Sequence, residues 1–409
     1  MPRLGGSGGT GDLPVPLDPI VESSVRAPLR AAIQNRHCFR RDFCECVRVI
    51  ASVTIRNFRA LKSAGLSLAP FNLVIGPNGS GKTSLIQAVL RLGALAKLPL
   101  RNSGASEEER ENIADAPELW WQFAPPHDGL EAVMKGLPGA KWDFLDVTKL
   151  PTGQGQNDWA GLRAELMRVR VFVLDPRALG ARSLSHDGAE LRGDGANLAA
   201  VIAALQMHAP AAFAQLRDEL CRIWPEYDDV QWRFAEDRSV EFSLRLAESG
   251  ELIPAERLSQ GTLCLLAMMA LAFDPKPPSI VCIEEVDRGF HPRLLRDVRD
   301  VLYRLSYPEA FGLRRAPSQV IATTHSPYLL DYFSEHPEEV VISEKRGAHA
   351  RLWRLSERKD LLDLLAEGGD GGGGCGLGEM WFSGILGGVP QESNPPAAEI
   401  PNPKIPNPK

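Results

Sequence analysis

Residues 71–90 read FNLVIGPNGSGKTSLIQAVL. The first five form an apolar run typical of a buried β-strand, and Leu85, Val89 and Leu92 recur at the spacing of a helix that buries one face. Between strand and helix, Gly76 to Thr83 fits the phosphate-loop pattern G-x-x-x-x-G-K-[ST] at every fixed position. The order strand, glycine-rich loop, helix predicts a nucleoside triphosphate site on an α/β sheet.

Each part of this phosphate loop has a predicted role. Glycines let backbone N–H groups wrap around phosphate oxygens, and the helix N-terminus adds its positive end. Lys82 would reach the β- and γ-phosphates, and the Thr83 hydroxyl would ligate Mg²⁺. Because the chain contains no Asn-Lys-x-Asp guanine motif, we expect ATP rather than GTP. The predicted nucleotide-binding residues here are Gly76, Pro77, Asn78, Gly79, Ser80, Gly81, Lys82, Thr83 and Ser84.

Two acidic residues end a second apolar strand. Ile280 to Ile283 lead directly into Glu284 and Glu285, which places both carboxylates at the carboxyl edge of the sheet, where ligands of α/β proteins bind. Adjacent acids in such a place are costly unless a cation or a reacting group uses them. We therefore predict that Glu284 holds Mg²⁺ and that Glu285 is the general base for the attacking water.

Two further segments place polar residues beside predicted core elements. The strand Val320 to Thr323 leads to His325, which would sense the γ-phosphate; a histidine satisfied by local backbone bonds is the alternative. Ser259 precedes the apolar helix Leu263 to Phe273 as a candidate N-cap, and Gly261 permits close backbone approach. By itself this segment is a capped core helix; the alternative is that its exposed N-terminus is an anion site for a phosphate bound on another subunit.

In chain order, GPNGSGKT, LSQGT, CIEE and TTHS resemble the motif set of ABC-type ATPases. An early VTIRNFRAL, the GFHP after the acids and the continuation TTHSPYLLDYF resemble more closely the RecF/SMC-like and OLD-like AAA ATPases of bacteria. The resemblance covers about residues 50–345, with a second short stretch at 376–388.

This resemblance implies roles for the motif residues. Ser259 and Gly261 would contact the γ-phosphate of a second protomer, Glu284 would be the Walker B acid, and Glu285 would be the catalytic base. His325 would be the switch histidine. The resemblance also implies a homodimer that closes on two ATP molecules and loosens after hydrolysis.

Some positions depart from the pattern of these relatives. Glu284 stands where an aspartate is commoner, and Val286-Asp287 stand where relatives often carry Pro-Glu. The glutamine that usually follows the first strand is not identifiable from the sequence. Gln122 is a weak candidate, and a surface glutamine beside core tryptophans is the favoured interpretation. Phe58 is placed either to stack on adenine or to be buried in its strand.

The whole chain reads as an α/β P-loop NTPase with a mainly parallel sheet, an ABC-ATPase-like head with a helical or inserted subdomain. Its 44% hydrophobic and 24% charged content is ordinary for a globular protein. We expect the ATPase domain at 49–365, with a variable insertion at about 100–165 and a helical lobe bearing LSQGT at 185–275. The expected strands are Phe71–Ile75, Val169–Leu174, Ile280–Ile283, Val320–Thr323 and Val340–Ser343.

Glycine- and proline-rich ends flank this domain. Residues 1–48 predict a flexible leader, and residues 366–409 predict a tail in which the apolar stretch 380–389 docks back on the body. The leader contains one group of ligand-type residues: His37, Cys38, Cys44 and Cys46. Their spacing matches no familiar zinc knuckle, so a leader without metal is the favoured interpretation.

The composition restricts the setting in which the protein works. The net charge of −6 gives no general attraction to nucleic acid, and the cysteines show no disulfide framework. No apolar run is long enough to span a membrane. We therefore expect a cytoplasmic protein without a membrane partner.

Two functions stay open. One is an ATP-hydrolysing switch in DNA repair or defence against foreign DNA, working with a separate nuclease or other effector. The other is a nucleotide-gated scaffold with little or no hydrolysis. A transporter subunit is disfavoured because GFHP is foreign to that group. Direct DNA binding is implied by the resemblance alone, since Arg293 to Arg304 and Arg314–Arg315 are typical of solvated helix faces.

Overall fold

The computed structural model describes residues 48–98, 116–136, 145–149, 158–184, 190–346, 349–360 and 376–387. All of them lie in one compact unit, Asp42–Lys409. The ligand-type group predicted in the leader lies outside the described residues.

A mixed sheet of 11 strands dominates the described residues, in the order β6-β5-β4-β1-β2-β15-β14-β3-β13-β12-β7. Its strands are β1 (Ile50–Phe58), β2 (Leu61–Ser67), β3 (Phe71–Ile75), β4 (Glu118–Phe123), β5 (Leu130–Lys135), β6 (Leu145–Lys149), β7 (Val169–Phe172), β12 (Ile280–Ile283), β13 (Gln319–Thr324), β14 (Val340–Arg346) and β15 (His349–Arg354).

The helices of the described residues are α3 (Lys82–Ala96), α4 (Trp159–Leu166), α5 (Pro176–Leu179), α6 (Leu198–His208), α7 (Pro210–Ile223), α8 (Gln260–Ala272), α9 (Leu295–Ser306), α10 (Pro327–Asp331) and α12 (Leu377–Phe382). Short 3₁₀ turns are Ala255–Arg257, Pro292–Leu294, Pro308–Phe311, Pro337–Glu339 and Leu355–Glu357. No helix among these residues is long and apolar enough to cross a membrane.

The half of the sheet that carries the motifs is parallel. β14, β3, β13, β12 and β7 lie side by side and pair in parallel. Every residue of β3, β12 and β13 is buried, as expected of strands covered on both faces. The α/β P-loop fold is therefore confirmed, and the predicted strands of this half lie within one to three residues of their expected ends.

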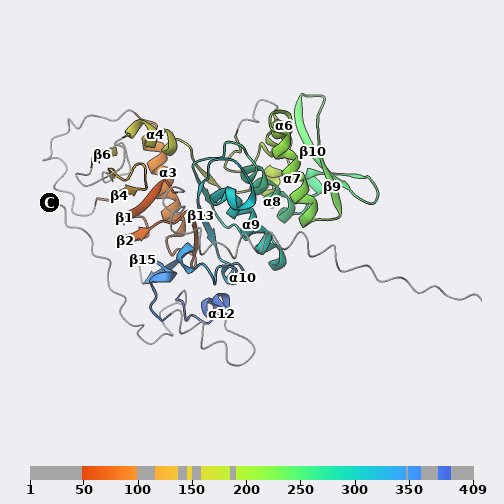
Figure 1. Ribbon diagram of the computed structural model, residues 1–409. Helices are drawn as coiled ribbons and strands as arrows, with labels where there is room; N and C mark the ends of the chain where they lie inside the picture. Colours follow the sequence, from red (N-terminus) through yellow and green to blue (C-terminus); the bar gives the residue numbers. More distant parts are fainter. Residues whose placement is uncertain are drawn as a thin grey trace, which may run out of the picture. The chain divides into compact units, whose positions relative to one another are not determined.

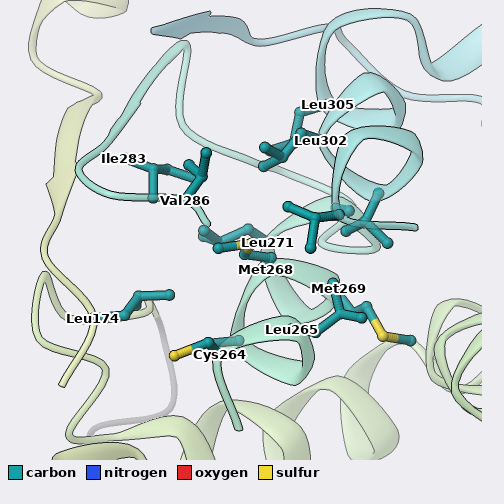
Figure 2. Close-up of a cluster of buried hydrophobic side chains, with 14 of the residues drawn as sticks. Leu174, Cys264, Leu265, Met268, Met269, Leu271, Ile283, Val286, Leu302 and Leu305 are labelled. Carbon is teal, nitrogen blue, oxygen red and sulfur yellow. The ribbon is translucent and has the colours of Figure 1, made fainter. Parts of the chain in front are cut away.

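Alternate residues of these strands pack into two hydrophobic clusters. Leu73 and Ile283 belong to the cluster formed with α8 and α9, whereas Val74 and Cys282 belong to the one formed with α3. Figure 2 shows part of the first cluster, in which side chains of α8 gather between the end of β12 and α9. Both faces of the parallel half are thus filled, which fixes the ends of the strands relative to the helices.

The other half of the sheet is mainly antiparallel, with β15 and β2 pairing in parallel, and differs from the expectation of a helical or inserted subdomain. β1 pairs with β2 and β4, and β4, β5 and β6 follow in antiparallel order. β4 and β5 bury alternate residues, the pattern of strands with one covered face. The segment 53–61, which reads VTIRNFRAL, spans a hairpin, because Phe58 pairs with Leu61 across a two-residue turn.

The lobe expected to be helical at 185–275 also contains a small second sheet. β10 (Ser239–Leu246) pairs antiparallel with β8 (Ser183–Leu184), β9 (Tyr227–Phe234) and β11 (Leu252–Pro254). α6 and α7 pack beside it, in the green part of Figure 1. The alternation of buried and partly exposed residues in β10 explains why this segment forms a strand.

The stretch expected to dock from the C-terminal tail does so. α12 packs against α10, and Leu377, Met380 and Leu386 join the main hydrophobic cluster. The Gly378 N–H donates to the Asp331 carboxylate at 2.7 Å. Residues 376–387 are therefore part of the folded body rather than of a tail.

Candidate nucleotide-binding site

The phosphate loop joins the buried strand β3 to α3 through two left-handed residues. Gly79 has φ +73° and Gly81, which caps α3, has φ +103°. A Cβ at Gly79 would meet no atom within 4 Å, so its backbone angle is what requires glycine there. A Cβ at Gly81 would also lie 2.9 Å from Leu61 Cδ2, in the hairpin between β1 and β2. These angles allow the loop to wrap a phosphate at the helix N-terminus.

Lys82 lies inside this loop. Its Nζ donates to the carbonyl oxygens of Gly76 at 2.7 Å and Pro77 at 2.9 Å. Burial lowers the pKa of Lys82 to about 8, although nearby carboxylates favour the charged form. Those carboxylates are Glu285, Asp287 and Glu284. A buried ammonium held by backbone carbonyls at the start of a helix suits a polyphosphate ligand.

Thr83 and Glu284 bring the loop and the β12 end together. The Thr83 hydroxyl donates to Glu284 Oε2 at 3.1 Å. A hydroxyl and one carboxylate are oxygen ligands of the kind that Mg²⁺ takes together with phosphate oxygens and water. The residues thus fit Mg²⁺, and the Glu284 side chain is long enough to reach the Thr83 hydroxyl.

Glu285 follows in an unusual backbone conformation. Its φ is +51°, a sparsely populated region for a residue other than glycine, and its side chain is 51% exposed. The Glu285 N–H donates to Thr323 Oγ1 at 3.0 Å, and the Val286 N–H donates to Thr323 O at 2.9 Å. β13 therefore holds the turn after β12, which leaves the Glu285 carboxylate at the surface of the site.

His325 stands at the end of β13, as predicted. Burial, and then the charge of Lys82, lower its pKa, whereas Asp287 and Glu285 raise it. Asp287 Oδ1 accepts from the Thr324 hydroxyl at 2.7 Å and from the His325 backbone N–H at 3.4 Å. Asp287 has no predicted role, although the departure of Val286-Asp287 from the usual Pro-Glu is a signal in the sequence that points to it.

Ser259 and Gly261 lie at the start of α8, away from these contacts. Ser259 caps the helix, since its Oγ accepts from the Thr262 N–H at 3.1 Å. A Cβ at Gly261 would lie 2.8 Å from Gly289 O. Their described contacts lead to α8 and to the turn after the acids, not to the phosphate loop, so a γ-phosphate role for them stays a prediction.

Burial and hydrogen bonds decide between the alternative roles of Phe58 and Gln122. Phe58 is 3% exposed in the core, which favours the buried strand residue over adenine stacking. Gln122 is exposed on β4 and accepts a hydrogen bond from the Ser52 hydroxyl at 2.9 Å.

Two of the arginines considered for DNA binding make contacts within the protein. Arg304 pairs with Glu219 at 3.0 Å, and Arg315 donates to Ala272 O at 2.7 Å. Neither is free for DNA.

Two family models match the chain. The one described as "AAA ATPase domain" matches residues 49–114, which contain the phosphate loop. The one described as "AAA domain, putative AbiEii toxin, Type IV TA system" matches residues 177–331, which contain Ser259, both acids and His325.

Curated proteins of similar sequence are DNA replication and repair proteins RecF. That of Erwinia tasmaniensis is 49% identical over 45 residues, 11% of this chain and 12% of the relative. That of Proteus mirabilis is 48% identical over 46 residues, 11% of this chain and 13% of the relative. The chain thus matches only about an eighth of the length of these relatives.

Two solved structures align over most of the chain at low similarity. The SMC head domain from Thermotoga maritima shares 13% identity over 75% of this chain and 98% of its own, with a TM-score of 0.42. A RecF structure, "recombination mediator protein RecF-ATPrS in RecFOR pathway", shares 9% identity over 76% and 99%, with a TM-score of 0.39.

The loop, the acids and the parallel sheet edge that joins them define a P-loop NTPase of the α/β class. Within that class the chain carries an AAA/ABC-like ATPase domain related to RecF. The resemblance to RecF that the motifs indicate is confirmed over the 45 to 46 residues that the RecF relatives match.

Proposed function

We propose that this protein is an ATP-binding and ATP-hydrolysing switch. The observation that supports it best is the hydrogen bond between Thr83 and Glu284, which joins the phosphate loop to the acidic strand end in one site. Lys82, whose pKa is influenced by Glu285 and Asp287, lies in the same site. A cation, a hydroxyl and paired acids at one sheet edge are what hydrolysis of a triphosphate requires.

Each residue then has a part in the reaction. Backbone N–H groups of the loop and the Lys82 ammonium bind the phosphates, and Thr83 and Glu284 hold Mg²⁺. When bound, Mg²⁺ supplies positive charge that stabilises the developing charge on the phosphates. The exposed Glu285 carboxylate accepts the proton of the attacking water, and His325 orients that water and contacts the γ-phosphate.

We propose further that two protomers share each site. Ser259 is exposed at the N-terminus of α8, a helix of 13 residues, so its hydroxyl and the helix end can face a phosphate held by a second copy. ATP would then close a homodimer, and hydrolysis would open it. The described cysteines are all free thiols, which supports a cytoplasmic setting.

The process served is proposed from the comparisons. Relatives named for DNA replication and repair support a role in repair, and the family description that names a toxin system supports one in defence. In either case a separate effector, such as a nuclease, would read the state of the switch. DNA would be bound only through arginines other than those used internally.

ATP turnover by the wild type and by Glu285→Gln tests this function. Loss of the general base should reduce kcat by about a hundredfold or more, while ATP binding persists. Glu251→Gln, an exposed glutamate in the lobe, is the matched control and should turn over ATP at the wild-type rate. Equal rates in all three proteins would favour the alternative, a nucleotide-gated scaffold with little or no hydrolysis.

A further inference from the structure

The turn after β12 is attached to the end of β13 by side chains from both strands. Thr323 Oγ1 accepts from the Glu285 N–H at 3.0 Å. In the opposite direction, the Thr324 hydroxyl donates to Asp287 Oδ1 at 2.7 Å. The turn that carries Glu285 and the strand end that carries His325 are therefore connected through two adjacent threonines. Thr323 is 2% exposed and Thr324 is 0% exposed.

We propose that Asp287 is a positioning residue for His325, holding it by accepting hydrogen bonds from the Thr324 hydroxyl and the His325 backbone N–H. The proposal rests on the proposed hydrolysis at this site and adds to it a residue outside the set to which nucleotide and metal binding are assigned above. Its geometry is a carboxylate oxygen with two donors, at 2.7 and 3.4 Å. Charge-assisted bonds of this kind are stronger than neutral ones and direct the groups they bind.

The hydrogen bonds continue into the segment that follows His325. The Ser326 N–H donates to Thr324 Oγ1 at 2.9 Å, and the Ser326 hydroxyl caps α10 by accepting from the Leu329 N–H at 3.3 Å. One threonine hydroxyl thus joins Asp287 to the residues on both sides of the histidine. Because Thr324 is buried, this arrangement has little freedom to change unless the Asp287 side chain moves.

The negative charge of Asp287 also affects the pKa of His325. The charged groups that act on the imidazole are Lys82 from α3, and Glu285 and Asp287 from the turn after β12. Lys82 lowers the pKa of His325, whereas Asp287 raises it. Removing the charge of Asp287 should therefore lower the pKa of His325, so that the imidazole stays neutral to a lower pH.

Asp287→Asn tests the charge, and Asp287→Ala tests the hydrogen bonds. The asparagine keeps an oxygen acceptor, so we expect kcat to fall about tenfold, and about a hundredfold for alanine, with the KM for ATP unchanged. NMR titration of the His325 imidazole should show a lower pKa in Asp287→Asn than in the wild type. Thr324→Ser should retain activity, whereas Thr324→Val, which lacks the donor, should lose it as Asp287→Asn does.

Asp297→Asn is the matched control, because Asp297 also accepts a hydrogen bond, from Arg222 at 2.8 Å, but on α9 outside the site. It should keep the wild-type kcat and histidine titration. An unchanged kcat and an unchanged His325 pKa in Asp287→Asn would overturn the proposal, as would the same losses in Asp297→Asn. If the wild type itself does not hydrolyse ATP, the proposed function fails, whereas the histidine titration still reports on Asp287.

Discussion

Lys82 makes nucleotide affinity depend on pH. Its side chain is buried, and burial lowers its pKa from 10.5 to about 8. The charged form pairs with phosphate, and its fraction falls from about nine-tenths at pH 7 to about one-tenth at pH 9. We therefore expect ATP to bind the wild type about tenfold more weakly at pH 9 than at pH 7, as calorimetric titration at both values would show.

The lowered pKa of Lys82 also makes the free energy of unfolding depend on pH. Between pH 8 and 10.5 the unfolded chain binds the Lys82 proton and the folded chain does not, so this residue makes stability rise with pH in that window.

Two variants serve as controls for the pH dependence of ATP affinity. Lys82→Met should bind ATP weakly at every pH. Lys97→Met, at the exposed C-cap of the same helix, should keep the wild-type pH dependence of ATP affinity. An affinity independent of pH in the wild type would contradict the assignment.

The close packing around Gly261 predicts that a side chain there destabilises the fold. A Cβ there would meet Gly289 O at 2.8 Å and Phe290 Cδ1 at 3.3 Å. Because a backbone oxygen cannot move aside cheaply, Gly261→Ala should destabilise the fold by about 1–3 kcal/mol. Gln260→Ala, one position earlier and exposed, should stay within about 0.5 kcal/mol of the wild type. Urea unfolding midpoints of the two variants measure both values, and equal midpoints would refute the packing role.

Residues were predictable from sequence where the local pattern alone requires them. The phosphate loop, Glu284 and Glu285 follow from fixed spacing beside apolar strands, and the structure brings Thr83 to Glu284. Asp287 was missed, because its partners Thr324 and His325 come from a strand some 37 residues later in the chain. Whether Phe58 was buried or exposed likewise depended on packing that the local pattern does not contain.

At the scale of elements, α12 is attached directly to the segment that carries His325. A Cβ at Gly378 would lie 2.4 Å from Pro327 O, in the first turn of α10. Gly378→Ala should therefore displace α12 and expose amides of α10. We expect faster hydrogen exchange in residues 327–333 and a loss of about 1–3 kcal/mol of stability.

Ser383→Ala is the control for this displacement. Ser383 lies just after the same helix, and its hydroxyl donates only to Met380 O at 3.2 Å. Exchange in α10 should match the wild type in that variant. If Gly378→Ala also leaves exchange in α10 unchanged, residues 376–387 do not support the histidine segment.

The elements themselves were predictable to different degrees. The strands of the parallel half are short, continuous apolar runs between polar ends, so they were recognised. β4, β5 and the strands of the lobe alternate over only a few residues, and each needs neighbours from distant segments to pair. Charged and tryptophan-bearing residues in such strands show no clear period, and their sequence therefore predicts an insertion or a helical lobe instead.

At the scale of the molecule, the lobe and the sheet form one packed body. Arg304 of α9 pairs with Glu219 of α7 at 3.0 Å, and their side chains are 11% and 9% exposed. The Arg304 guanidinium also lies 4.6 Å from the centroid of the Phe311 ring. Such a buried pair resists separation, so we expect the lobe that carries Ser259 to move with the sheet rather than fold over its own phosphate loop.

A second protomer must then supply Ser259 to each site, and mixing two inactive variants tests this. In a mixed dimer of Lys82→Met and Ser259→Arg, one site holds both changes and the other holds neither. A one-to-one mixture should therefore recover about a quarter of the wild-type ATPase rate, since about half of the dimers are mixed and each has one intact site. Each variant alone should be inactive.

Lys82→Met mixed with Glu285→Gln is the matched control. Thr83 and Glu284 are bonded within one chain, so Lys82 and Glu285 belong to the same half of a site. Each site of that mixed dimer then carries one change, and no activity should return. Recovery in the first mixture alone would require that Ser259 acts across the dimer. No recovery in either would mean that each chain completes its own site, and the ATP-driven clamp would have to be abandoned even if hydrolysis itself stands.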